Sequence, residues 1–151
     1  MEMNTITLVT LNNLALANND RMAAYEQAMG VMNKQNGSAD GTDLLAFFSN
    51  YFNDSRAFSK QLALMAGEEF YLPDSEEKTV NMFTGTATSI PADRSQVLAV
   101  CYKGEEQTNK LYEYALDEEA ISMDTKNILL RQKEEVLRAQ KILESLLKRA
   151  A

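Results

Sequence analysis

Apolar residues recur along four stretches of the chain at alternating steps of three and four. This spacing places side chains on one face of an α-helix. The first stripe consists of Leu8, Leu11, Ala15, Asn18, Met22, Tyr25, Met29 and Met32. Asn18 is its only strongly polar member, so the pattern predicts a helix whose buried face is interrupted once near the middle.

A second stripe follows after Asn36-Gly37, a dipeptide typical of turns. Its members are Leu44, Phe48, Tyr51, Ser55, Phe58, Leu62 and Met65. Ser55 interrupts this stripe near its middle. Gly67 comes directly after the last periodic residues, where glycine commonly ends a helix.

The helical pattern stops between Glu68 and Ile90, a stretch that contains Pro73 and Gly85. Helix connections in bundles usually take roughly 2 to 8 residues. A link this long predicts a crossover along the bundle. The apolar residues expected to pack this crossover against the helices are Phe70, Tyr71, Leu72, Val80, Met82 and Phe83.

Two further helices are predicted after Pro91. Residues 93–96, at the start of the first of them, resemble a capping box. The third stripe is Leu98, Cys101, Glu105, Thr108, Tyr112 and Ala115. A short turn over residues 117–122 precedes the fourth helix. The fourth face is Ile128, Leu129, Gln132, Glu135, Val136, Ala139, Ile142, Leu143 and Leu146.

Four helices of roughly 25 residues, each about 38 Å long, make a single all-α domain spanning residues 1–151. Short, long and short connections join them. This order predicts two antiparallel helix pairs joined by a crossover between helices two and three, which is the ferritin-like topology of four-helix bundles.

Composition narrows the possible partners and location. A net charge of −7 argues against nucleic acid, because phosphate binding depends on clustered lysine and arginine. No apolar run approaches the roughly 20 residues that span a bilayer. The chain opens on Met-Glu-Met, without the basic residues of a secretion signal, and has one cysteine, Cys101. We therefore expect an acidic cytoplasmic protein.

If the four helices are level, their polar interruptions meet at mid-height. The residues of this predicted polar core layer are Asn18, Tyr25, Ser55, Arg56, Glu105, Gln132, Glu135 and Arg138. Bundle-core di-iron sites use glutamates together with Glu-x-x-His motifs. The chain has no histidine, and the corresponding spacings end in arginine, at Arg56 and Arg138. Arginine offers only donors and cannot ligate a metal.

Two interpretations of the layer remain. In the first, Glu105 and Glu135 are hard oxygen ligands that would hold a hard cation weakly, with help from Asn18 and Asp54. Alternatively, Arg56 and Arg138 neutralise these two glutamates in a hydrogen-bonded network. We favour the second interpretation and expect no metal and no cofactor.

Catalytic constellations are not found elsewhere in the sequence. Without histidine, neither Cys101 nor a serine has the usual general base of nucleophilic catalysis. Tyr25, Tyr112 and Tyr114 stand at helical spacing, which is typical of core aromatics. The sequence therefore favours a protein that is not an enzyme.

The chain resembles a bacterial family of uncharacterised ferritin-like four-helix-bundle proteins. The resemblance rests on Leu11-Asn12-Asn13-Leu14, Asn19-Asp20-Arg21, Tyr25-Glu26-Gln27-Ala28, the stretch from Phe52 to Leu62, Gly104-Glu105-Glu106, Tyr112 and Ala115. It implies the ferritin-type fold without an established activity. Compared with true ferritins, Asn18 replaces an expected glutamate, and Arg56 and Arg138 replace both histidines, which leaves Glu105 and Glu135 as the matching ligands.

Three functional hypotheses follow. The first is a non-catalytic bundle that acts through protein contacts, of which homo-oligomerisation is one form. The second is a divergent carboxylate-based metalloprotein that uses Glu105 and Glu135. The third is a carrier with a small-ligand pocket between its helices.

Overall fold

Helices make up almost the whole of the computed structural model, which describes residues 4–34, 39–67 and 94–150. Four α-helices run in the order α1 (Thr5–Lys34), α2 (Ala39–Ala66), α3 (Arg94–Asp117) and α4 (Met123–Ala150). Within these ranges there is no strand. The predicted all-α class and the four helices are confirmed.

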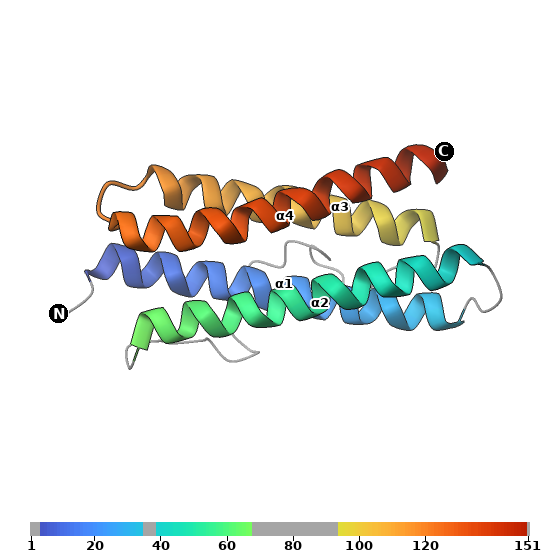
Figure 1. Cartoon of the computed structure of the whole chain (residues 1–151), viewed down its shortest axis with the longest axis horizontal. Helices are drawn as coiled ribbons and strands as arrows, with labels where there is room; N and C mark the ends of the chain where they lie inside the picture. Colours follow the sequence, from blue (N-terminus) through green and yellow to red (C-terminus); the bar gives the residue numbers. More distant parts are fainter. Residues whose placement is uncertain (1–3, 35–38, 68–93, 151) are drawn as a thin grey trace.

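The helices form two antiparallel hairpins that lie side by side (Figure 1). Helix α2 returns along α1, and α4 returns along α3. The last turn of α2 lies at the end of the bundle where α1 begins, whereas α3 begins at the opposite end. The predicted crossover, with its six apolar residues and the proposed capping residue Asp93, lies outside the described residues.

Local signals in the sequence end and begin the helices. Gly67 has a φ of 68°, the left-handed conformation that favours glycine after a helix. At the start of α4, the Ser122 hydroxyl accepts a hydrogen bond from the backbone N–H of Thr125 at 3.2 Å. Asn4 caps α1 by accepting from the N–H of Thr7 at 2.8 Å. Its amide also donates to the Ala120 carbonyl at 2.9 Å, which ties the α3–α4 turn to the start of α1.

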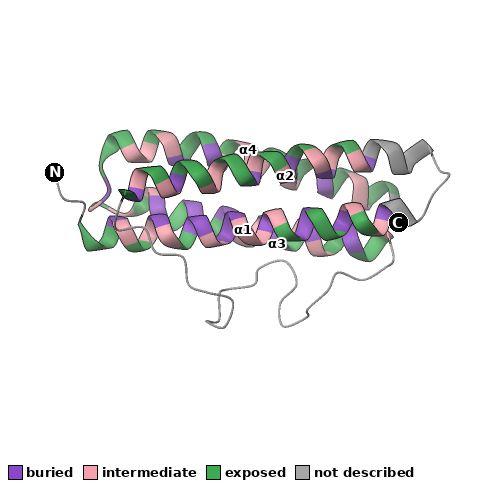
Figure 2. Cartoon of the chain, turned by 90° about the horizontal axis from the view of Figure 1, so that it is seen from below, coloured by how far each residue is buried: buried purple, intermediate pink, exposed green. Residues whose placement is uncertain are grey.

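Buried residues follow the inner faces of all four helices (Figure 2). They form two apolar clusters, one toward each end of the bundle. The cluster near the α3–α4 turn contains Leu11, Leu14, Ala15, Leu62, Ala66, Tyr112, Ala115, Ile121, Leu129 and Val136. The cluster toward the other end, which we call the far cluster, contains Ala24, Tyr25, Ala28, Met32, Leu44, Phe48, Tyr51, Val97, Leu98, Cys101, Ala139 and Leu143. Polar side chains occupy the level between them.

None of the described helices combines the length and the apolar character required to cross a bilayer.

Candidate functional site

The level between the two apolar clusters is built around an ion pair between Arg21 on α1 and Glu105 on α3. The Nε of Arg21 donates to Oε1 of Glu105 at 2.7 Å, and Nη2 donates to Oε2 at 2.9 Å. Both side chains have an exposed fraction of 0%. Two parallel charge-assisted hydrogen bonds of this kind are the strongest geometry that arginine and a carboxylate can adopt.

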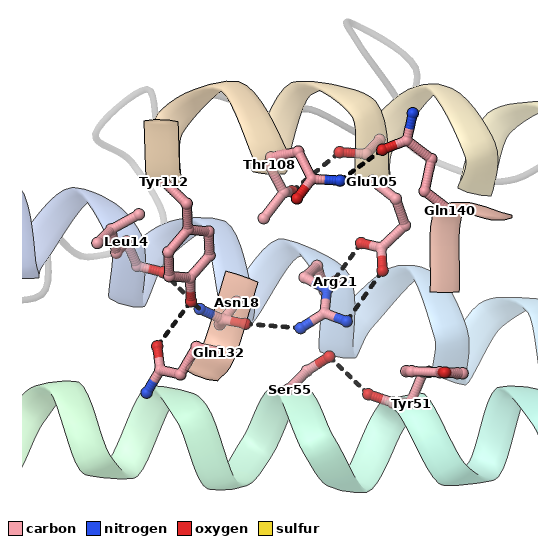
Figure 3. A network of polar contacts seen from close by, with 12 residues as sticks. Leu14, Asn18, Arg21, Tyr51, Ser55, Glu105, Thr108, Tyr112, Gln132 and Gln140 are labelled. Carbon is pink, nitrogen blue, oxygen red and sulfur yellow. Dashed lines mark hydrogen bonds and ion pairs between the residues drawn. The ribbon is translucent and has the colours of Figure 1, made fainter. Parts of the chain in front are cut away.

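A chain of hydrogen bonds continues from this pair across the bundle (Figure 3). The Nη1 of Arg21 donates to Oδ1 of Asn18 at 2.8 Å, and Nδ2 of Asn18 donates to the Tyr112 hydroxyl at 2.9 Å. That hydroxyl donates to Oε1 of Gln132 at 2.7 Å. Gln132 in turn donates to Oε1 of Gln61 at 2.9 Å. The chain therefore includes a side chain from each of the four helices.

Two buried hydroxyl groups next to this chain are satisfied within their own helices. The Ser55 hydroxyl donates to the Tyr51 carbonyl at 2.6 Å, and the Thr108 hydroxyl donates to the Gly104 carbonyl at 2.9 Å. Serine and threonine commonly bond the carbonyl four residues earlier in a helix. These two side chains therefore sit in the core without needing a partner on another helix.

Burial has the largest influence on both members of the ion pair. It raises the pKa of the Glu105 carboxyl, and the charge and hydrogen bonds of Arg21 oppose that shift. For Arg21, burial acts to lower the pKa, but the charge and hydrogen bonds of Glu105 and the charges of Tyr25 and Tyr112 together outweigh it, and the pKa of the guanidinium is raised. The layer therefore holds a permanent cation whose counter-charge is one carboxylate.

Aromatic rings lie beside the ion pair. The Arg21 guanidinium carbon lies 5.8 Å from the centre of the Phe58 ring, within the range of a cation–π contact. Tyr25 is fully buried, and burial followed by the charge of Glu105 raises the pKa of its phenol. Its ring lies 5.9 Å from Phe48 and 6.1 Å from Tyr51, centre to centre. The pair thus borders the aromatic part of the far cluster.

The prediction that Arg56 and Arg138 lie in the core layer is wrong. Arg56 is exposed. The Arg138 side chain has an exposed fraction of 63% and donates to Glu135 at 2.6 Å, an i,i+3 pair on the surface of α4. Glu135 itself is only half-buried, because it lies beside the inward face that Gln132 and Val136 occupy.

The other five residues predicted for the layer are buried: Asn18, Tyr25, Ser55, Glu105 and Gln132. Sequence reasoning missed the central arginine. Arg21 stands three residues after Asn18 and four before Tyr25, so it fits the buried face of α1, whereas Met22 is half-buried. The spacing is compatible with either Arg21 or Met22 on the buried face.

The two glutamates considered as metal ligands are each engaged by an arginine. Glu105 is paired with Arg21 in the core, and Glu135 with Arg138 at the surface. In the described ranges, no three histidine, cysteine, aspartate or glutamate side chains come together in a way that would hold a metal ion.

Comparisons with protein-family models, with curated proteins and with solved structures find no match to this chain.

Proposed function

We propose that this chain is a non-catalytic, ferritin-like four-helix bundle that acts through protein contacts. The observation that carries the proposal is the fully buried, bidentate ion pair between Arg21 and Glu105. In bundles with di-iron sites, carboxylates and histidines in the core hold the metal cations. Here a guanidinium supplies the positive charge from within the chain.

The ion pair also opposes metal binding energetically. A metal that took Glu105 as a ligand would leave the Arg21 guanidinium buried without its counter-charge. Removing one partner of a buried pair costs about 3–5 kcal/mol, because an uncompensated charge remains in the core. A weak site with few carboxylates and no histidine would have to overcome that cost.

The arrangement of the helices supports the ferritin-like topology. The helices form two antiparallel hairpins, and α2 ends at the opposite end of the bundle from the start of α3. The connection over residues 68–93 therefore has to join opposite ends, as a crossover does.

Large apolar side chains gather on the surface at one end, which we call the turn end: the end where α1 begins, α2 finishes and α3 turns into α4. Among the described residues, six of the seven exposed large apolar side chains belong to the helix parts near this end. They are Ile6, Val9, Leu64, Tyr114, Met123 and Leu130, and the seventh is Ile142. Exposed apolar side chains commonly mark protein interaction sites where they adjoin one another.

Metal analysis tests the proposal. Protein expressed in rich medium and purified without chelator is analysed by mass spectrometry of its elements, beside the variants Glu105→Gln and Glu135→Ala. We expect iron and manganese far below one ion per chain in all three proteins. Stoichiometric metal in the wild type that is lost in either variant would overturn the proposal in favour of the carboxylate metalloprotein.

A further inference from the structure

A groove opens near the turn end between α1 and α3, two helices that lie side by side. Its volume is about 160 Å³. A cavity of about 150 Å³ holds a molecule the size of benzene, so the groove has room for one side chain and not for a large cofactor. The buried Leu14 and Ala115 line it together with the half-buried Leu111. This apolar part of the groove suits the stem of a long side chain.

The polar groups of the groove offer hydrogen-bond acceptors on both walls. On α1, the Thr10 hydroxyl donates to the Ile6 carbonyl at 2.8 Å, which leaves its oxygen as an acceptor. The Asn13 amide adds a second oxygen on the same wall. On the other wall lies the carboxylate of Glu118, whose Oε1 accepts from the backbone N–H of Ala120 at 3.4 Å. A ligand with several donors therefore finds partners on both sides.

Charge selects a cationic ligand for this groove. None of the described residues that line it is basic, and in the described ranges no lysine or arginine forms an ion pair with Glu118. Asp117 and Glu119 flank this carboxylate in the sequence. The whole chain carries a net charge of −7, so its field attracts cationic groups and repels anionic ones.

Tyr114 favours arginine among the cationic side chains. It is 72% exposed and lies four residues before Glu118, whose N–H bonds the Ala115 carbonyl in the last turn of the helix. The ring and the carboxylate are therefore neighbours on one surface. A guanidinium stacks on aromatic faces and pairs with a carboxylate through two of its five donors, whereas the lysine ammonium is a strongly hydrated point charge.

We propose that this groove is the docking site for an arginine side chain of a partner protein. The guanidinium stacks on Tyr114 and pairs with Glu118, and the stem lies against Leu14 and Leu111. This inference rests on the proposed function and names the chemistry of the partner. Buried arginine anchors carry much of the binding energy of many protein interfaces.

Apolar residues beside the arginine would also be covered by this chain. Ile6 is 49% exposed and Val9 is 50% exposed. They lie one helical turn before Thr10 and Asn13 and thus border the groove. A peptide segment with apolar residues next to its arginine therefore fits this surface better than free arginine does.

A blocked arginine, acetyl-arginine methylamide, tests the groove. It is titrated into the full-length protein labelled with ¹⁵N, and the backbone amide shifts are followed by NMR. We expect saturable shifts at Asn13, Tyr114 and Glu118 with a Kd of about 1 mM, which is ordinary for a ligand of this size. Acetyl-citrulline methylamide has nearly the same shape without the charge and should bind at least about tenfold more weakly.

Three variants locate the binding site. Glu118→Gln should weaken the binding of blocked arginine by about tenfold or more. Glu119→Gln removes the same charge at an exposed neighbouring position and should change the affinity by less than about twofold. Tyr114→Ala should weaken binding by about two- to fivefold, because the aromatic face is lost.

A longer probe separates a partner protein from free arginine. Acetyl-Leu-Arg-Leu-amide should bind at least about threefold more tightly than blocked arginine, and Val9→Ser should remove that gain without weakening blocked arginine. Equal affinities of the two probes would make this a site for free arginine and overturn the docking proposal.

Three other results would overturn the inference as a whole. They are the lack of saturable shifts up to about 10 mM blocked arginine, equal binding of the citrulline probe, and equal effects of Glu118→Gln and Glu119→Gln. None of these results changes the metal content, which decides the proposed function separately.

Discussion

Arg21 and Glu105 lie 84 residues apart in sequence and meet through two parallel hydrogen bonds of 2.7 and 2.9 Å. Arg21 belongs to the first helical hairpin and Glu105 to the second. Their ion pair therefore joins the hairpins through the core, where neither side chain reaches water.

The first prediction concerns the removal of one charge from this pair. Glu105→Gln keeps the size of the side chain but leaves the guanidinium without a counter-charge. We expect the free energy of unfolding to fall by about 3–5 kcal/mol, measured by urea denaturation followed by circular dichroism. The double variant Arg21→Met, Glu105→Leu should recover a large part of this loss, since replacement of both charges by apolar groups is often tolerated.

Arg138→Ala is the control for that experiment. Arg138 also pairs with a glutamate, but at the surface, with 63% of its side chain exposed. Its loss should cost less than about 1 kcal/mol, the usual value for an exposed pair. Equal losses of unfolding free energy in Glu105→Gln and Arg138→Ala would contradict the burial of the Arg21–Glu105 pair.

Tyr112→Phe should break the hydrogen-bond chain in its middle. The Tyr112 hydroxyl accepts from Asn18 and donates to Gln132, and both partners are buried. Losing it leaves a buried amide hydrogen and a buried amide oxygen without their partner, so we expect a loss of about 1–3 kcal/mol in unfolding free energy. Tyr114→Phe removes an exposed hydroxyl two residues away and should change stability by less than about 0.5 kcal/mol. Similar losses in both variants would contradict the chain.

Asp54 on α2 gives a prediction about pH. Burial and, next, the charge of Glu135 raise the pKa of its carboxyl above the ordinary value of 3.8. The folded chain therefore binds this proton more tightly than the unfolded chain, so stability falls as the pH rises from 3.8 through the folded pKa. Asp54→Asn should raise the urea midpoint at neutral pH and lose that advantage below 3.8. The exposed Glu119→Gln serves as the control for the loss of one negative charge.

Cys101 should be unreactive in the folded protein. The thiol is fully buried, and burial raises its pKa, which suppresses the reactive thiolate. We expect Ellman's reagent to modify it only when denaturant unfolds the chain. An Ala57→Cys variant, with the new thiol at an exposed position of α2, should react at one site without denaturant. Rapid modification of the wild-type thiol in buffer would contradict the packing of the far cluster.

The sequence was most informative about the buried face of the third helix. All six residues of the third stripe, Leu98, Cys101, Glu105, Thr108, Tyr112 and Ala115, are buried as predicted. Helix ends were also predictable at Gly67 and Ser122, because local backbone geometry decides them. These features depend on short-range physics that spacing reveals.

The partner of Glu105 could not be predicted in the same way. Arg21 and Met22 both fit the spacing of the first stripe, and arginine is rarely buried, so the methionine was the more natural choice. Only the position of α1 relative to α3 shows that a carboxylate faces position 21. Arg56 and Arg138 were misplaced because their spacing matched a metal motif, whereas the rotation of each helix turns them toward solvent.

The polar layer between the two apolar clusters also sets the register of the helices. Leucine and alanine recur on the same face of α1, so a slide of the helix by one turn, about 5.4 Å, would still bury apolar side chains. A slide of α1 by one turn would put Ala17 or Tyr25 where Arg21 now meets Glu105. The carboxylate would then be buried without its cation. The ion pair thus excludes packings that the apolar clusters alone would accept.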